Sequence, residues 1–417
     1  MAGLPERPVS VPDWADWLLS ELDAFARIGE SGKGGVCRLA GDEADCKARD
    51  HLRQLFEEAG AEVLVDAVGN MFGVFRLSET GKTAVLAGSH LDSQPTGGRF
   101  DGTYGVLAAL TAARRLKESG ETFRHDLVVC NWTNEEGARF TPSLTGSSVF
   151  AGALTSDAAL NLADASGMTL GEALLAIGYA GTDRLPYEPV HAVEIHIEQG
   201  PRLEAADVQI GIVESAWAAR KLCLAFDGAP AHTGPTPMEE RRDALLAASR
   251  AICLLHDWGR IFGQGVHTSC ARLENDPNSA NVVPQTCTVW MEIRHPSADI
   301  CRVFADVFLL RLEELLLPDR TGYRVLSDAI RVSPSLSSEG RDLAEDVCAQ
   351  AGIAALRLDT VAGHDALALA AAMPSSLFFV PSRDGISHSP REFTAEADLI
   401  AGAEFLTSFI RKKLQPA

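Results

Sequence analysis

Residues 83–116 have the sequence TAVLAGSHLDSQPTGGRFDGTYGVLAALTAARRL. The apolar run 83–87 predicts a buried strand, residues 97–102 form a glycine-rich loop, and residues 106–116 have the spacing of a helix. A strand, a loop and a helix in this order make one α/β unit. The connection carries His90 and Asp101, and burying such groups is costly unless they are neutralised or bind a cation.

Three further apolar runs lead into histidines or acids. They are residues 126–130 before Glu135 and Glu136, residues 192–196 ending in His196, and residues 376–380 before His388. Open α/β sheets hold their sites at the carboxyl ends of strands, so these side chains are expected to meet. They supply nitrogen and oxygen ligands for two divalent ions about 3.5–4 Å apart. No cysteine lies in these motifs, which favours Zn²⁺, Mn²⁺, Co²⁺ or Ni²⁺ over an iron–sulfur or cysteine–zinc centre.

The length of 417 residues indicates two domains, since single cores rarely grow beyond about 250–300 residues. Between residues 213 and 332 the pattern changes to alternating strands and long amphipathic helices, which predicts a βαββα-like α+β insertion. We therefore expect an α/β catalytic domain from residues 1–212 and 333–417, with a mixed sheet and helices on both faces. Residues 213–332 would form an inserted lid or dimerisation domain.

Composition restricts the partners and the compartment. There are 37 Lys and Arg against 57 Asp and Glu, a net charge of −20, which disfavours nucleic acid and anionic membranes as partners. Nine scattered cysteines without a C-x-x-C pair suit a reducing compartment. Residues 1–23 have no basic stretch followed by an apolar one, and the apolar run 366–380 is too short to span a bilayer. A soluble, cytoplasmic protein is expected.

Four motifs occur in a fixed order: GSHLD at 88–92, NEEG at 134–137, HIEQGP at 196–201 and GISHSP at 385–390. In these motifs the chain resembles the hydantoinase/carbamoylase-type amidases of the dinuclear zinc-peptidase superfamily, over about residues 35–409. That family includes N-carbamoyl-L-amino-acid hydrolases, β-ureidopropionases and allantoate amidohydrolases. The resemblance implies a zinc-peptidase-like fold and two divalent metal ions per subunit, with Zn²⁺ favoured and Mn²⁺, Co²⁺ or Ni²⁺ as alternatives.

The resemblance also assigns metal ligands. It implies that His90 and His196 bind opposite metals, that Asp101 bridges them, and that Glu136 binds one ion and His388 the other. These are the same side chains that the strand ends predict.

Two neighbouring acids receive other roles. Asp92 resembles the acid that orients the imidazole of His90 and raises its basicity, with a solvated strand-end acid as the alternative. Glu135, beside the metal-binding Glu136, is predicted to be the general base that takes a proton from water and delivers it to the leaving nitrogen. A helix-capping or solvent-exposed Glu135 is the alternative.

Substrate contacts are expected from both domains. Residues 228–234 resemble a family stretch whose histidine, here His232, reaches the other subunit's site and stabilises an oxyanion, which implies a homodimer. Asn281 and Arg294 resemble the pair that binds the substrate carboxylate, for which the planar fork of arginine is suited. Gln199 resembles a third substrate contact. Without the resemblance, His232 would be taken as a surface residue and Arg294 as part of a structural ion pair.

The implied reaction is hydrolysis of the ureido C–N bond of an N-carbamoyl-L-amino acid, or of N-carbamoyl-β-alanine, to the amino acid, carbon dioxide and ammonia. The alternatives are an allantoate or ureidoglycolate amidohydrolase, an aminoacylase or dipeptidase using the same two-metal site, and a binding protein without catalysis. Pro235 departs from the Gly-Thr-Thr-Pro of some carbamoylases, which weakens the transfer of one particular substrate. Residues 363–365 match another family stretch to which no chemistry is assigned.

Overall fold

The computed structural model describes residues 12–79, 81–263, 265–332 and 335–415. The chain divides into two compact units. Unit 1 is Met1–Ser215 with Pro334–Ala417, and unit 2 is Ala216–Ser333, where an insertion of residues 213–332 was expected. The N-terminal residues 1–11 and the expected return point at 333 lie outside the described residues.

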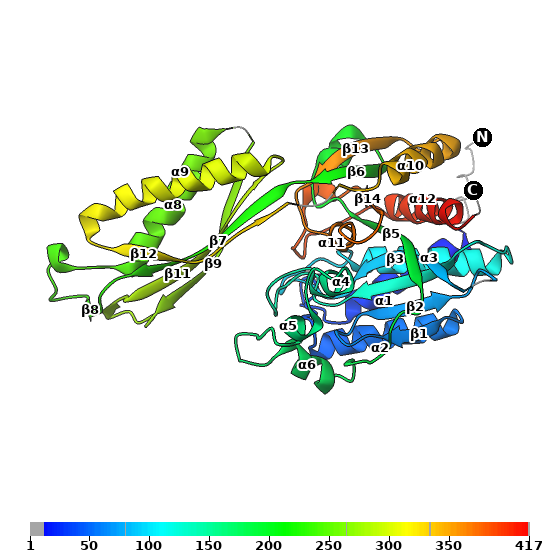
Figure 1. Cartoon of the computed structure of the whole chain (residues 1–417), viewed down its shortest axis with the longest axis horizontal. Helices are drawn as coiled ribbons and strands as arrows, with labels where there is room; N and C mark the ends of the chain where they lie inside the picture. The colour runs from blue at the N-terminus through cyan, green and yellow to red at the C-terminus, as the bar shows by residue number, and fades with distance from the viewer. Residues whose placement is uncertain (1–11, 80, 264, 333–334, 416–417) are drawn as a thin grey trace, which may run out of the picture. The chain divides into compact units, whose positions relative to one another are not determined.

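Unit 1 is built on an eight-stranded mixed sheet with the order β1-β2-β4-β3-β5-β14-β6-β13 (Figure 1). The strands are β1 (Glu62–Val65), β2 (Met71–Phe75), β3 (Thr83–His90), β4 (Asp126–Trp132), β5 (Glu188–Ile197), β6 (Ile210–Ala216), β13 (Ala355–Thr360) and β14 (Ser375–Val380). Strands β4, β3, β5 and β14 are parallel to their neighbours within this group, whereas β2 and β6 run antiparallel beside it. The predicted mixed α/β sheet is confirmed.

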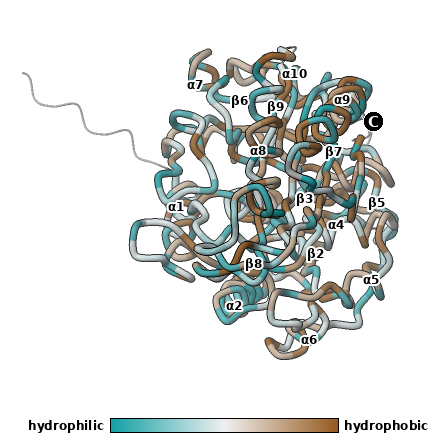
Figure 2. Tube along the Cα trace, turned by 90° about the vertical axis from the view of Figure 1, so that its left-hand side faces the viewer, coloured by the Kyte–Doolittle hydropathy of each residue, from teal (hydrophilic) through white to brown (hydrophobic). Residues whose placement is uncertain are grey.

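Helices cover both faces of this sheet. Successive apolar side chains of its central strands point to opposite faces, so each face needs a cover. Val85 and Ala87 face one core with α1 (Asp13–Arg27), α3 (Thr103–Glu118) and α12 (Glu396–Leu414). Leu86 faces a second core on the side of α4 (Thr145–Phe150) and α11 (Asp365–Leu369). The other helices of unit 1 are α2 (Glu43–Glu58), α5 (Ser156–Leu160), α6 (Leu170–Ala176), α7 (Arg202–Ala206) and α10 (Ser338–Ala351). The tube of α2 is largely hydrophilic, as expected of a helix with one exposed side (Figure 2).

Unit 2 is a four-stranded antiparallel sheet with the order β12-β7-β11-β9 and two helices packed on it. Its elements are β7 (Ala218–Asp227), β8 (Ala231–His232), α8 (Ala244–Phe262), β9 (His267–Asp276), β10 (Val282–Val283), β11 (Thr286–His295), α9 (Ala298–Leu316) and β12 (Gly322–Arg331). Every second residue of β11 is buried, and these side chains share one core with α8 and α9. The strand β12 adds to the expected βαββα pattern.

The parallel strands bring the predicted ligands to one edge of the sheet. His90, at the end of β3, is level with Trp132 at the end of β4, and His196 on β5 is level with Phe379 on β14. The loops that follow these strands therefore start from the same edge.

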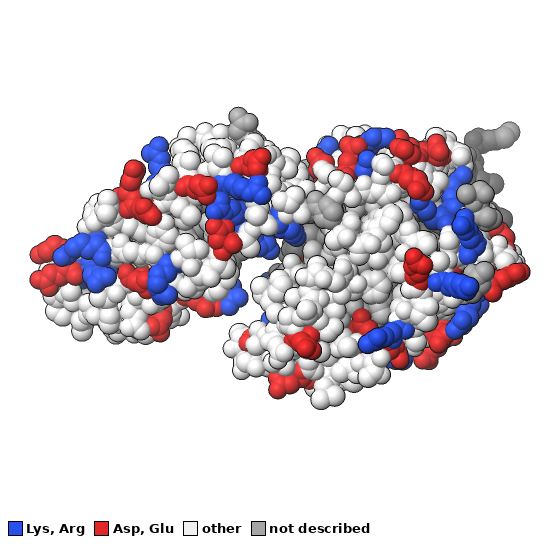
Figure 3. Space-filling view, viewed as in Figure 1, with Lys and Arg blue, Asp and Glu red and all other residues white. Residues whose placement is uncertain are grey.

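Two further features concern the apolar character of the helices and the charges on the surface. No helix in the described part of the chain combines the length and the apolar character needed to cross a membrane. On the face drawn in Figure 3, acidic and basic side chains are interspersed over the surface.

Candidate metal centre

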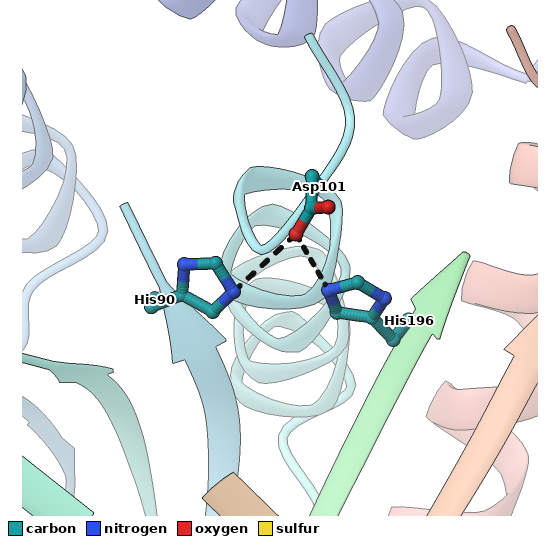
Figure 4. A group of neighbouring side chains, drawn as sticks. All are labelled: His90, Asp101 and His196. Atoms are coloured by element: carbon teal, nitrogen blue, oxygen red, sulfur yellow. Dashed lines mark hydrogen bonds and ion pairs between the residues drawn. The ribbon is translucent and has the colours of Figure 1, made fainter. Parts of the chain in front are cut away.

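Three buried side chains form what we call the first cluster (Figure 4): His90 and His196 at the ends of β3 and β5, and Asp101 in the loop before α3. The Oδ1 atom of Asp101 lies 3.5 Å from Nε2 of His90 and 3.1 Å from Nε2 of His196. One donor atom from each residue lies within 4.8 Å of the others. Two imidazoles and a carboxylate converging in this way can hold one divalent ion.

Main-chain contacts turn both imidazoles toward the cluster. Nδ1 of His90 lies 2.8 Å from the carbonyl oxygen of Asp92, and Nδ1 of His196 lies 2.8 Å from that of Ile197. A carbonyl oxygen only accepts hydrogen bonds, so each neutral ring carries its proton on Nδ1 and presents the lone pair of Nε2. Both rings are thus held in the form that ligates a metal.

Gly102 makes room for this arrangement. Its φ is +64°, and a Cβ there would lie 2.4–2.6 Å from the ring of His90. Its N–H donates to Nε2 of His196 at 3.0 Å. A larger residue would meet the ring and would also adopt a backbone conformation that side chains disfavour.

The second cluster comprises Asp101, Glu136 and His388. Nε2 of His388 lies 3.5 Å from Oδ2 of Asp101 and 3.4 Å from Oε2 of Glu136. Oε1 of Glu136 is buried and has no hydrogen-bond partner among the described residues. A buried carboxylate oxygen without a partner fits a metal ligand, because a cation would compensate its charge.

The way in which the ligands are shared between the two metal positions differs from what the resemblance implied. His90 and His196 were expected on opposite metals, but both lie beside Oδ1 of Asp101 and belong to one cluster. That expectation is wrong because the neighbouring parallel strands β3 and β5 bring the two histidines to the same side of Asp101. Asp101 itself turns Oδ1 to the first cluster and Oδ2 to the second, the position that a bridging ligand requires.

The charges are consistent with a site that is completed by cations. Although burial acts to raise it, the pKa of Asp101 lies well below its ordinary value because His196 and His90 stabilise the carboxylate. Burial, together with the charge of Asp101, raises the pKa of Glu136 to about 8. Burial also raises the pKa of Glu135 well above its ordinary value. The donor set of imidazole nitrogens and carboxylate oxygens fits two divalent ions, which would restore the ionised forms of these acids.

Asp92 holds the turn that carries Glu135 and Glu136. Its Oδ1 accepts the N–H of Glu135 at 3.1 Å, and its Oδ2 accepts the N–H of Glu136 at 3.2 Å. The Asp92 carboxylate is 3.9 Å from Nδ1 of His90, which instead contacts the Asp92 carbonyl. The carboxylate is therefore within ion-pair distance of the ring without hydrogen-bonding it, and its predicted orienting role stays a prediction. Its contacts position the two glutamates.

Glu135 faces the first cluster. Its Oε2 lies 3.5 Å from Nε2 of His90, and the residue is 7% exposed, so it is neither a helix cap nor a solvated surface acid. The preceding Asn134 has φ +54° and is fixed by its Nδ2, which donates to the oxygens of Phe140 and Thr145 at 2.7 Å each. This turn directs Glu135 inward.

Gln199 lies at the second cluster. Its Nε2 donates to Oδ2 of Asp101 at 2.8 Å and is 3.5 Å from Nε2 of His388. It therefore adjoins the candidate metal ligands directly, where a substrate contact would also have to lie.

The predicted residues of unit 2 fall at two places. His232 on β8 is paired with Val282 on β10, and the N–H of Thr233 donates to the carbonyl of Asn281 at 3.3 Å, so His232 and Asn281 are neighbours. Arg294 is eight residues beyond Thr286 along β11, roughly 27 Å at ~3.4 Å per residue. Arg294 therefore lies toward the opposite end of β11 from the strand end that follows Asn281, and their joint binding of a carboxylate stays a prediction.

Arg294 has a partner on its own strand. Its Nη2 donates to Oε2 of Glu292 at 2.8 Å, and its side chain is 27% exposed. The alternative interpretation of this arginine as part of an ion pair thus agrees with the structure.

Sequence reasoning missed two buried charged residues beside the clusters. Arg38 donates from Nε to the carbonyl of Leu91 at 2.9 Å and from Nη2 to Oγ1 of Thr103 at 2.7 Å, next to His90 and Asp101 along the chain. Glu392 contacts the Asp101 loop. Neither belongs to a motif with a known ligand spacing, and in sequence a buried charge looks like a solvated one.

The fold and the two clusters have the form of a hydrolase with a two-metal site. The sequence pattern of peptidase family M20/M25/M40 matches residues 86–412, and the chain belongs to this family. Within it, the chain is similar to an amidase of the hydantoinase/carbamoylase family from Burkholderia vietnamiensis, with 36% identity and a TM-score of 0.90 over 97% of this chain and 98% of the other. This bears out the family resemblance, and the chain is an amidohydrolase.

Two relatives carry names that specify a substrate. An N-carbamoyl-L-amino-acid amidohydrolase from Rhizobium meliloti is 35% identical over 94% of each chain. An allantoate amidohydrolase from Bacillus subtilis (strain 168) is 31% identical over 97% of each chain. Both substrates contain a ureido group and a carboxylate.

Proposed function

We propose that this protein is a metal-dependent amidohydrolase that cleaves the ureido C–N bond of an N-carbamoyl-L-amino acid or of N-carbamoyl-β-alanine. Water adds across that bond, and the products are the amino acid, carbon dioxide and ammonia. The observation that carries the proposal is the pair of ligand clusters sharing Asp101, with Glu135 beside them, in a chain similar to named carbamoylases.

Two divalent ions would be held by the two clusters, one by His90, Asp101 and His196 and one by Asp101, Glu136 and His388. When bound, such ions polarise a carbonyl and lower the pKa of water. Zn²⁺ is our first choice, and Mn²⁺, Co²⁺ or Ni²⁺ have the same ligand preferences.

Glu135 would move the proton. The Glu135 carboxylate is buried and lies beside His90, and the backbone N–H of Glu135 donates to Asp92, which fixes the turn that carries it. There the carboxylate would accept a proton from the attacking water. It would then deliver that proton to the leaving nitrogen, which departs as ammonia. Replacing it by Gln keeps the shape and removes the base.

Substrate would be held by groups of both units. Arg294 offers a planar fork for the carboxylate, Gln199 a further contact, and His232 with Asn281 an oxyanion and carboxylate site. Because Arg294 and Asn281 lie at opposite ends of the unit 2 sheet, we infer that His232 and Asn281 act on the partner subunit of a homodimer. The acidic balance and nine free cysteines support a cytoplasmic protein without nucleic-acid or membrane partners.

The test is ammonia release by the Zn²⁺-loaded protein from N-carbamoyl-L-amino acids, N-carbamoyl-β-alanine and allantoate. Amine release from N-acetyl amino acids and dipeptides is followed in parallel, each with a chelated control. Ammonia from a carbamoyl substrate that is lost on chelation is the expected result. Cleavage of only acyl or peptide bonds would overturn the ureido assignment and leave the metal site intact.

Allantoate is the second candidate, supported by the similarity to the Bacillus subtilis allantoate amidohydrolase. A preference for allantoate in the same assay would change the assigned substrate from a carbamoyl amino acid to this related ureido compound. Glu135→Gln should remove ammonia release from either substrate by at least ~100-fold while both ions stay bound; full activity in this variant would exclude Glu135 as the base.

A further inference from the structure

We propose that Glu392 is a positioning residue that holds the Asp101 loop against the His388 loop and thereby sets the affinity of the second cluster for its ion. The inference rests on the proposed two-metal site but not on the substrate. Glu392 belongs to neither cluster, and its carboxylate joins segments that are almost 300 residues apart along the chain.

The carboxylate of Glu392 contacts both loops. Oε1 accepts the N–H of Phe100 at 2.9 Å and the N–H of Asp101 at 3.1 Å. Oε2 lies 2.9 Å from Oγ of Ser387, the residue before His388. The same hydroxyl is 2.9 Å from Oδ2 of Asp101, the oxygen that faces the second cluster. Glu392 therefore fixes the backbone of the bridging ligand and, through Ser387, the approach of His388.

Gly98 forms a socket for this carboxylate. A Cβ at Gly98 would lie 1.9–2.2 Å from the carboxyl atoms of Glu392, which are the three nearest atoms to that position. Glu392 is 5% exposed, so the carboxylate is buried where the side chain of any residue other than glycine at position 98 would lie. The absence of a side chain at Gly98 is what allows the acid to reach two backbone N–H groups.

The backbone of His388 needs such support. Its φ is +51°, in the left-handed region that a non-glycine residue occupies only when its surroundings enforce it. The N–H of Glu392 donates to the carbonyl of Ser389 at 3.0 Å, and its carboxylate contacts Ser387, so Glu392 is bound on both sides of His388. The His388 side chain is 48% exposed, so burial restricts it less than it restricts the histidines of the first cluster.

The first cluster depends on Glu392 only through Asp101. Its histidines sit on neighbouring strands β3 and β5 and are oriented by the carbonyls of Asp92 and Ile197. Loss of Glu392 should thus weaken the second ion far more than the first. A residue that only stabilised the fold would instead lower both affinities and the unfolding temperature together.

The experiment is a Zn²⁺ titration of the chelated full-length protein against a competing chelator, with no substrate present. His388→Ala identifies the binding step that belongs to the second cluster. We expect Glu392→Ala to weaken that step by roughly 10- to 100-fold, the range for outer contacts of metal ligands, and to weaken the first step several-fold less, because the first cluster shares only Asp101 with the contacts of Glu392. Glu392→Gln should lie between it and the wild type, because the amide oxygen still accepts backbone N–H groups.

Two further variants separate positioning from general damage. Gly98→Ala should reproduce the loss of the second step by displacing the carboxylate, and it should add nothing in the Glu392→Ala background. Asp126→Asn is the matched control, since Asp126 is a buried acid that accepts the N–H groups of Leu77 and Ser78 at the far end of β4. This variant should leave both Zn²⁺ steps intact.

Three outcomes would overturn the proposal. Glu392→Ala could weaken both steps equally, it could weaken neither, or the Gly98→Ala and Glu392→Ala losses could add in the double variant. Because the experiment measures Zn²⁺ binding, its result does not depend on which amide the protein cleaves. A wild-type protein that binds fewer than two ions would contradict the proposed metal site itself, which is a different outcome.

Discussion

Replacing Asp92 by Asn distinguishes two roles of this acid. The carboxylate either positions Glu135 and Glu136 or orients the imidazole of His90. The carboxylate of Asp92 accepts the N–H groups of Glu135 and Glu136, one on each oxygen. An asparagine has the same shape but only one acceptor, so one of these N–H groups would face an NH₂ group. The contact between Nδ1 of His90 and the Asp92 carbonyl belongs to the main chain and survives the substitution.

The expected loss follows from one charge-assisted hydrogen bond. Such a bond contributes about 1.5–3 kcal/mol, and at ~1.36 kcal/mol per tenfold this corresponds to roughly 10- to 150-fold in rate. The loss should appear in kcat, since the turn carries the base Glu135. The first cluster keeps its two imidazoles in place, and its affinity for Zn²⁺ should therefore stay close to the wild-type value.

The assay measures kcat by ammonia release at saturating Zn²⁺, and the Zn²⁺ affinity of the first cluster by chelator competition. If Asp92 acted mainly by orienting His90, the result would be the reverse. Zn²⁺ affinity would fall by roughly 10- to 100-fold while kcat of the fully loaded enzyme was kept. That result would refute the positioning role that the structure assigns to this acid.

Chelation should remove the second ion before the first, because His388 is 48% exposed whereas the histidines of the first cluster are buried. Metal analysis during timed dialysis should therefore find a species with one ion, and simultaneous loss of both ions would contradict this prediction. Burial, with the charge of Lys413, lowers the pKa of His191 to about 3 from an ordinary 6.5. Below pH 6.5 the histidine of the unfolded chain binds a proton that the folded chain does not, so stability present above pH 6.5 is lost toward pH 3, by up to ~5 kcal/mol. On chelated protein, His191→Asn should flatten the unfolding temperature against pH relative to wild type, and parallel profiles would exclude this. Mixing inactive Glu135→Gln and His232→Ala dimers should restore roughly a quarter of wild-type activity if His232 acts across the dimer, and none if it acts within its own subunit.

The sequence predicted the parts of the fold that burial patterns describe. Strands β3, β4, β5 and β14 are largely apolar, as expected of strands with both faces covered, and the candidate ligands lie at their ends or in the loops that follow. The edge strands β9 and β12 were harder to predict, because most of their residues are exposed and show no regular alternation. Sequence periodicity reports burial, and an exposed edge strand buries too little to produce it.

The site was predictable at the level of residue types and less so at the level of contacts. The spacing of His90, Asp101 and His196 indicated a shared site, but which ligands share an ion depends on strand order. Motif resemblance likewise placed Asp92 beside His90, while its carboxylate turns to a different loop. No periodicity could reveal Glu392, since its function depends on a socket at Gly98 that only the folded chain creates.

The two clusters differ in what fixes their geometry, and this difference explains where substitutions should matter. The first cluster takes its histidines from paired parallel strands, so the sheet itself sets their separation. The second takes Glu136 and His388 from loops, which lack a ladder of hydrogen bonds. In both loops a buried acid that is not itself a candidate ligand supplies the missing contacts, Asp92 for one and Glu392 for the other. The loop acids should therefore control the second ion and the base, whereas disrupting the pairing of β3 with β5 should cost the first ion and the fold together.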